Sequence, residues 1–269
     1  MTLRDMLLAI FATLTLTPGC SQSASAPYLG VAPQGDASAG AHFATGPCAS
    51  CHGAHGNSLS GTFPNLAGQN YNYLLKQLAD FRDGTRKAAP MNAMIGTVPK
   101  AADQDNLKNI AAYYAAQSLD RKTNANAHAP QLTRAEASMG YKIFQQGLPA
   151  EHVPSCAACH SPDGTGMAPM AIPSLVGQQS AYVEKQLKMF ADGTRHNSPG
   201  HIMAMIAKRL TPGQIKAVAL YAQALHPKLL PGSGPKSYQA YVKGLARQPV
   251  PGIPAGAVKD SKAATKSGR

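Results

Sequence analysis

Apolar residues recur at the spacing of an α-helix in the second half of the chain, between loops rich in glycine and proline. Tyr182, Val183, Leu187 and Phe190 lie on one face of such a helix, and Gly193 interrupts the pattern. This is typical of an amphipathic helix that ends at a glycine. No run of alternating apolar and polar residues indicates a strand, so the sequence predicts an all-α fold.

Capping boxes mark the starts of two further helices in the second half. Thr133 with Glu136 begins one of them, which leads toward residue 156. Thr211 with Gln214 begins the other, and Pro212 stands at its first helical position. Both patterns satisfy backbone N–H groups that a helix start leaves without partners.

The first half shows the same plan with weaker start signals. Three helices are expected there, one before residue 48, one in the middle and one at the end. Their apolar positions are Gly40 and Phe43, then Leu74, Leu75, Leu78 and Phe81, then Leu107, Ile110, Ala111 and Tyr114.

The two halves are copies of one sequence. Segments 64–66 and 173–175, 68–69 and 177–178, 76–78 and 185–187, and 81–86 and 190–195 match one another in order. We therefore expect two tandem domains related by internal duplication, at residues 37–119 and 131–226. The polar, aperiodic segment 120–130 between them is expected to be a linker.

The segment CASCH at 48–52 recurs as CAACH at 156–160. CxxCH is the attachment signature of a c-type haem: two thiols one turn apart can form thioethers with both vinyl groups, while the imidazole that follows faces the iron. Two covalently bound haem c groups are therefore expected. The candidate residues are Cys48, Cys51, Cys156 and Cys159 for attachment, with His52 and His160 as iron ligands.

Two other uses of paired cysteines are possible. A thioredoxin-like redox pair needs a strand before a helix, and no strand pattern precedes either copy. A zinc site with four cysteines usually has about 15 to 20 residues between its pairs, whereas 104 residues separate Cys51 from Cys156. Neither alternative explains why a histidine follows the second cysteine in both copies.

Composition agrees with a bound apolar group in each domain. The 269 residues include no tryptophan, and only 6% are aromatic, which would leave two domains short of large core side chains. Haems would supply that bulk. Thioether formation would use four of the five cysteines, so no disulfide framework is expected.

The remaining cysteine, Cys20, follows a segment that reads as a secretory signal, residues 1–19. Its apolar run, 6–16, is too short to span a bilayer. Residues 16–20 resemble a lipoprotein cleavage box that would leave Cys20 lipidated. An ordinary cut after Ala26, or a buried N-terminal helix, are the alternatives. Residues 20–36 then form a flexible spacer.

From about Gly40 to Leu225 the chain resembles the diheme cytochromes of the c4 family. The resemblance rests on the two CxxCH segments, on the paired Pro-x-Leu-x-Gly-Gln and Asp-Gly-Thr-Arg segments, and on a methionine before each last helix. The resemblance implies a periplasmic location. It also implies two halves that pack about a pseudo-twofold axis with the haem propionates at the interface.

The resemblance implies a methionine as the second axial ligand, seven residues before the apolar residue that leads into the last helix. Counting back from Leu210 gives Met203, and counting back from Val98 gives Met91. A soft thioether favours ferrous iron and raises the reduction potential. The nearby Met94 and Met205 are then packing residues, as most methionines are. In the first domain Val98-Pro99-Lys100-Ala101 replaces the helix cap, so the segment that carries Met91 is expected to differ.

His201 is a rival ligand, because it lies two residues before Met203 and imidazole also binds haem iron. Its other interpretation is a loop histidine. The family pattern further implies that the carbonyls of Pro64 and Pro173 accept the Nδ1 protons of the haem histidines. The alternative for these two residues is that they are plain turn prolines.

The segment 227–269 is expected to be a disordered basic tail. Residues 226–269 contain eight Lys or Arg and one acid, which is +7 of the formal net charge of +12. Such a tail either keeps the protein soluble or contacts anionic lipid or an acidic redox partner. Nucleic acid is not an expected partner of an exported haem protein.

Three functions are compatible with two such haems. The first is an electron carrier between a respiratory donor, such as a quinol-oxidising complex, and a terminal oxidase or reductase. The second is a fixed haem subunit of a dehydrogenase or oxidase complex. The third is a diheme peroxidase, which needs a displaceable sixth position, and a methionine candidate in both domains counts against it. Membrane association through a lipidated Cys20 or the basic tail fits any of them.

Overall fold

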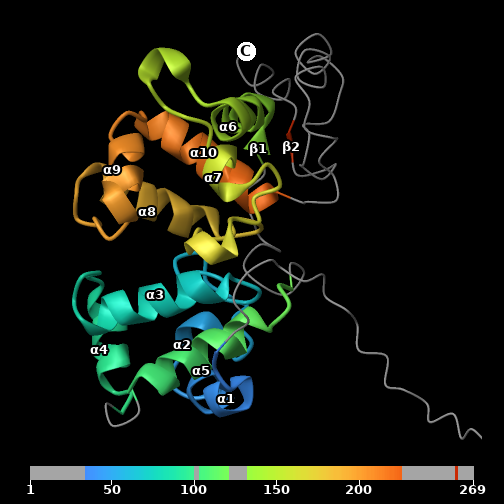
Figure 1. Ribbon diagram of the computed structural model, residues 1–269. Helices are drawn as coiled ribbons and strands as arrows, with labels where there is room; N and C mark the ends of the chain where they lie inside the picture. Colours follow the sequence, from blue (N-terminus) through green and yellow to red (C-terminus); the bar gives the residue numbers. More distant parts are fainter. Residues whose placement is uncertain (1–33, 100–102, 121–131, 226–257, 260–269) are drawn as a thin grey trace, which may run out of the picture.

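The computed structural model describes residues 34–99, 103–120, 132–225 and 258–259, which form two helical domains one above the other in Figure 1. The expected signal, Cys20, nearly all of the linker and nearly all of the tail lie outside these residues. The all-α prediction is confirmed, as is the duplication: the described helices fall into two groups with the same order.

Domain 1 is the lower one in Figure 1. Its helices are α1 (Ala37–Thr45), α2 (Ala49–His52), α3 (Tyr71–Arg82), α4 (Ala89–Gly96) and α5 (Asp103–Ala115). Helix α5 packs against both α1 and α3. The carboxylate of Asp36 caps α1, since it accepts hydrogen bonds from the N–H groups of Ser38 and Ala39.

Domain 2 repeats this plan with additional short turns. It contains α6 (Arg134–Gln146), η3 (Pro149–Glu151), α7 (Ala157–His160), η4 (Ala168–Met170), α8 (Ser180–Ala191), η5 (Pro199–His201), α9 (Ile202–Ala207) and α10 (Pro212–Ala224). Both predicted capping boxes are confirmed: Thr133 with Glu136 starts α6, and Thr211 with Gln214 starts α10.

Two very short strands were not expected from the sequence. Strand β1 (Leu132–Thr133) pairs in parallel with β2 (Val258–Lys259), and Leu132 lies opposite Val258. Two residues are too few to show an alternating pattern, which needs about four to eight. The pairing brings part of the tail to the start of α6, so the expectation of a disordered tail is wrong at residues 258–259.

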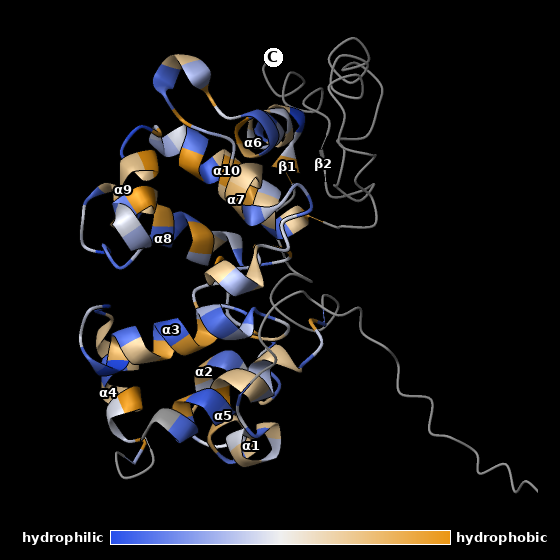
Figure 2. Cartoon of the chain, in the orientation of Figure 1, coloured by the Kyte–Doolittle hydropathy of each residue, from blue (hydrophilic) through white to orange (hydrophobic). Residues whose placement is uncertain are grey.

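Each domain has its own apolar core, where its first and last helices cross. Phe144 and Tyr221 are fully buried in domain 2, as are Leu107 and Tyr114 in domain 1. Helices α3, α8 and α10 carry both polar and apolar residues, as amphipathic helices do (Figure 2).

A glycine allows the close approach of the helices at each crossing. A Cβ at Gly40 would lie 2.0 Å from the carbonyl oxygen of Asn109 in α5, and a Cβ at Gly140 would lie 2.5 Å from that of Ala217 in α10. No side chain fits at such distances, so glycine at these two positions sets the distance between the helices.

Two arginines form matching hydrogen bonds across the boundary between the domains. Arg86 Nη2 donates to Tyr182 Oη at 2.9 Å and to Gln186 Oε1 at 2.8 Å. Arg195 Nη2 donates in the opposite direction, to Gln77 Oε1 at 3.1 Å. Because Arg86 and Arg195, and Gln77 and Gln186, are equivalent positions of the repeat, the two domains are related by a pseudo-twofold axis, as the resemblance implied.

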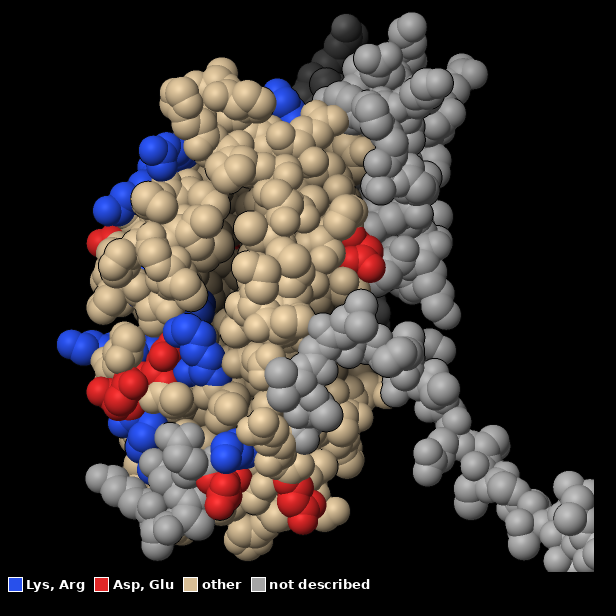
Figure 3. Space-filling view, in the orientation of Figure 1, with Lys and Arg blue, Asp and Glu red and all other residues tan. Residues whose placement is uncertain are grey.

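Charged side chains are unevenly placed on the surface. On the face shown in Figure 3 they lie mainly along the left side and over the lower domain, while much of the upper domain carries none. Within the described part of the chain, every helix is too short or too polar to cross a membrane.

Candidate haem sites

Each CxxCH segment forms a single helical turn that ends at its histidine. Helix α2 in domain 1 ends at His52, and α7 in domain 2 ends at His160. Both histidines are buried, with 5% and 8% of their surface exposed. The two cysteine pairs lie in different domains, and the described residues contain no cluster of three or more Cys, His, Asp or Glu side chains that could hold a metal ion, which argues against a zinc site shared by all four thiols.

The orientation of each imidazole is fixed by a backbone carbonyl. His52 Nδ1 lies 3.0 Å from the carbonyl oxygen of Pro64, and His160 Nδ1 lies 3.0 Å from that of Pro173. A carbonyl can only accept, so in both histidines Nδ1 carries the proton and Nε2 presents a lone pair. The predicted hydrogen bonds are confirmed, and neither proline is only a turn residue.

Burial favours the neutral form of both imidazoles. It lowers the pKa of His52 and of His160 below the usual value, although the hydrogen bonds to the proline carbonyls act in the opposite direction. A neutral imidazole is the form that binds a metal.

The first cysteine of each CxxCH segment does not have the character of a redox-active thiol. Burial raises the pKa of Cys156 to about 12 and also raises that of Cys48. Redox-active cysteines have lowered values, because a nearby positive charge or helix start stabilises the thiolate. Neither of these two partly buried thiols has the lowered pKa of a redox-active cysteine.

The surroundings fit a large, mainly apolar group. Partly exposed apolar side chains lie at the edge of each core: Cys48, Leu66, Leu75, Leu78 and Met91 in domain 1, and Cys156, Leu175, Met203 and Ile206 in domain 2. The hydroxyl of Tyr71 is buried in the domain 1 core without a hydrogen-bond partner. A buried hydroxyl is costly without one, and a polar substituent of a bound group would satisfy it.

The candidate methionines differ in their packing, although Met94, like Met91, is partly buried. Met91 in α4 and Met203 in α9 are half-buried and pack against the cores of their domains. Met205 is 50% exposed. Met91 in domain 1 and Met203 in domain 2 could each supply a thioether to a group held by the histidine of the same domain.

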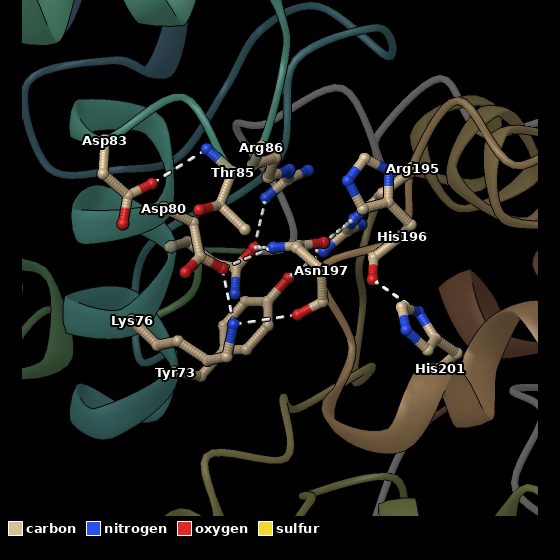
Figure 4. Close-up of polar contacts among 11 residues, drawn as sticks. Tyr73, Lys76, Asp80, Asp83, Thr85, Arg86, Arg195, His196, Asn197 and His201 are labelled. Atoms are coloured by element: carbon tan, nitrogen blue, oxygen red, sulfur yellow. Dashed lines mark hydrogen bonds and ion pairs between the residues drawn. The ribbon is translucent and has the colours of Figure 1, made fainter.

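His201 is placed differently from Met203. Its side chain is exposed, and its Nδ1 donates to the carbonyl oxygen of His196 at 3.1 Å (Figure 4). This exposed position and the hydrogen bond within its own loop agree with the interpretation of His201 as a loop histidine. The geometry therefore favours Met203 over His201 as a candidate ligand.

The two methionine segments differ in length and form. Met91 lies five positions after Arg86, but Met203 lies eight positions after Arg195. The longer segment contains η5, where Gly200 has a φ of 57°. The expected difference between the segments is therefore present.

The fold and these sites define a c-type cytochrome with two haem domains. The cytochrome c family model matches residues 37–118 and 137–226. Cytochrome c4 of Azotobacter vinelandii is 40% identical over 221 residues, which covers 80% of this chain and 97% of the relative. The chain belongs to the cytochrome c4 family, and it carries two covalently bound haem c groups.

Two further similarities add detail. The crystal structure of reduced cytochrome c4 from Pseudomonas stutzeri is 36% identical and covers 71% of this chain and all of that one, with a TM-score of 0.64. A protein of Thiomonas intermedia named thiosulfate dehydrogenase electron acceptor is 38% identical, over 67% of this chain and 80% of the relative. Family membership makes the chain an electron-transfer cytochrome.

Sequence reasoning did not assign the polar residues between the domains. Gln69, Arg86, Gln178 and Arg195 are buried there and hydrogen-bonded across the boundary. Their recurrence in both copies, within Gly-Gln and Asp-Gly-Thr-Arg, was the available signal, because a repeated polar residue with no surface role is expected at a shared interface.

Proposed function

We propose that this cytochrome is a periplasmic electron carrier in which both irons have one histidine and one methionine ligand. The ligands are His52 and Met91 in domain 1 and His160 and Met203 in domain 2, with thioethers from Cys48, Cys51, Cys156 and Cys159. The observation that carries the proposal is the pair of 3.0 Å hydrogen bonds from the two imidazoles to the carbonyls of Pro64 and Pro173, which leave Nε2 of both histidines available.

Haem c, when bound, supplies one-electron chemistry between ferric and ferrous iron. The protein's part is to hold its ligands still. The proline carbonyls fix the imidazole planes, the four-residue turns fix the thiols, and the domain cores hold the methionine segments. Little has to move when an electron arrives or leaves, and filled axial positions give no place for a substrate.

For the donor, we propose a dehydrogenase or a quinol-oxidising complex, and for the acceptor a terminal oxidase or reductase. The name of the Thiomonas relative supports a dehydrogenase donor. A fixed subunit would use the same chemistry. Purification under mild conditions separates the two forms, since a fixed subunit would elute with a stoichiometric partner and a mobile carrier would elute alone.

Export and lipidation at Cys20 are proposed from the apolar run 6–16 and the box at 16–20. We expect a Cys20→Ser variant to leave the membrane fraction while its haem content stays unchanged. If the variant remains with the membrane, and removal of residues 227–269 releases it, the basic tail is the anchor instead.

The test of the ligands is a near-infrared spectrum of the air-oxidised protein. Methionine bound to ferric haem gives a weak charge-transfer band there, whose intensity is compared with total haem. We expect two methionine-ligated haems per chain. One such haem together with a high-spin signal from the other would contradict the carrier and favour a peroxidase.

A further inference from the structure

The peptide group that orients each haem histidine is also bonded to the other domain. The carbonyl oxygen of Pro64 accepts the Nδ1 proton of His52 at 3.0 Å. The N–H of the same peptide group, which belongs to Asn65, donates to Oε1 of Gln178 at 2.8 Å. A continuous chain of hydrogen bonds therefore runs from the imidazole of domain 1 to a side chain of domain 2.

The same arrangement occurs in the opposite direction. The carbonyl oxygen of Pro173 accepts the Nδ1 proton of His160 at 3.0 Å, and the N–H of Ser174 donates to Oε1 of Gln69 at 2.7 Å. Gln69 and Gln178 occupy equivalent positions of the repeat. Each domain thus contributes one glutamine to the histidine support of the other.

Both glutamine side chains are held firmly. Gln178 Nε2 donates back to the carbonyl oxygen of Asn65 at 2.9 Å, and Gln178 Oε1 also accepts the N–H of Gln179 at 3.0 Å. Gln69 makes the same pair of bonds, to Ser174 at 2.9 Å and with Asn70 at 2.8 Å. Because all four partners are backbone atoms with fixed roles, the orientation of both amides is determined.

The contacts of Gln178 with Asn65 are buried, and those of Gln69 with Ser174 are partly buried. Gln69 and Gln178 are each 7% exposed, and Asn65 is 4% exposed. Hydrogen bonds in such surroundings polarise one another, by roughly 10 to 30% per bond. An acceptor on the N–H of a peptide group therefore makes its carbonyl oxygen a better acceptor in turn.

We propose that Gln178 tunes the haem iron of domain 1, and Gln69 that of domain 2, through these peptide groups. The proposal rests on the assignment of His52 and His160 as ligands. A stronger acceptor at Nδ1 makes the imidazole a better electron donor to iron. That stabilises the ferric state and lowers the reduction potential. Gln69 and Gln178 are positioning residues, because neither would touch the iron or the haem ligand itself.

The test compares Gln178→Leu with Gln69→Leu by redox titration of the whole protein. Gln178→Leu removes the acceptor from the Asn65 N–H, so the potential of the domain 1 haem should rise and that of the domain 2 haem should stay. We expect a two- to threefold shift in its ferric-to-ferrous ratio, or about 20 to 30 mV at 59 mV per tenfold for one electron. Gln69→Leu should produce the reverse pattern.

The matched control is Asn72→Ala. Asn72 Nδ2 also donates across the boundary, to the carbonyl oxygen of Ala168 at 3.0 Å, but that peptide does not support a histidine. Neither potential should move in this variant. Each potential is assigned to its domain with Met203→Ala, in which the potential of domain 2 should fall. The Nδ1 proton of His52, observed by NMR in the ferrous protein, should change its chemical shift in Gln178→Leu only.

Several results would overturn the proposal. Equal shifts in both haems, a shift in the domain that carries the substitution, or unchanged potentials would each show that no such relay operates. If Gln178→Leu does not fold, Gln178→Asn, whose shorter side chain withdraws the amide, should give the same selective rise. If the unaltered protein lacks histidine and methionine ligation, the proposed function fails, which the near-infrared spectrum shows independently.

Discussion

The two domains are nearly identical on the histidine side and different on the methionine side. His52 and His160 each meet a proline carbonyl at the same distance of 3.0 Å. Met91, in contrast, lies in the first turn of a continuous helix, while Met203 follows a 3₁₀ turn that contains two left-handed residues, Gly200 and His201. The hydrogen bond that orients the histidine is therefore the same in both copies, whereas the segment that carries the methionine has diverged.

A second difference lies at the boundary between the domains. Asp80 in domain 1 accepts from Lys76 Nζ at 2.5 Å and from Asn197 Nδ2 at 2.6 Å, as Figure 4 shows. The equivalent position in domain 2 is Met189, and the equivalent of Asn197 is Ala88. The hydrogen bonds of the arginines and glutamines across the boundary occur in both directions, but this carboxylate occurs only in domain 1. A symmetric interface can therefore carry an asymmetric charge.

The largest effect should come from removal of a methionine ligand. Met203→Ala should abolish half of the near-infrared band, and Met91→Ala the other half, because each thioether serves one haem. Met94→Ala and Met205→Ala are the controls and should leave the band unchanged. Loss of the whole band in either single ligand variant, or of none, would contradict the assignment.

Next in size are the glycines at the helix crossings. Gly40→Ala and Gly140→Ala should each lower the free energy of unfolding by about 3 kcal/mol, the upper end for overpacking, because the new Cβ meets backbone. The 2.0 Å approach at Gly40 should make domain 1 the more sensitive domain. Urea denaturation measures this, with Gly213→Ala as the control, since a Cβ there meets no atom within 4 Å.

Conversion of the boundary carboxylate tests the second difference. Asp80→Met gives domain 1 the residue of domain 2 and leaves Lys76 Nζ and Asn197 Nδ2 without this acceptor. We expect a loss of about 2 kcal/mol in unfolding free energy, typical of hydrogen bonds to a charged group. Met189→Leu, the matching change in domain 2, should alter the urea midpoint little. Equal losses would mean that the asymmetry has no energetic role.

The smallest effect concerns the start of α6. Lys216 and Thr133 hold the pKa of Glu136 below its usual range. A lowered folded-state value means that the contribution is present above the unfolded pKa and is lost as the pH falls through the folded one. Because the side chain of Lys216 is 57% exposed, screening by solvent limits this contribution to less than ~1 kcal/mol. Glu136→Gln should flatten the acid limb of urea midpoints measured from pH 6 to about pH 3, and an unchanged limb would exclude this contribution.

The sequence predicted the repeated chemistry well and the interface poorly. Two CxxCH segments and two capping boxes are local patterns whose meaning does not depend on distant residues. The bonds from Gln69 and Gln178 join positions more than a hundred residues apart, and no periodicity within one helix records such a partner. The β1–β2 pairing was missed for a similar reason, because each strand is too short to carry a pattern.

The matched bonds of the two glutamines have the form of an isologous contact, in which residue i of one copy meets residue j of the other, and j meets i. That is the symmetry of a homodimer. A single ancestral domain with these residues could have bound a second copy of itself before any duplication. Joining two such copies in one chain would then have required no new surface. The association of the two copies would then no longer have depended on protein concentration. Each copy could also have acquired residues, such as Asp80, that the other copy lacks.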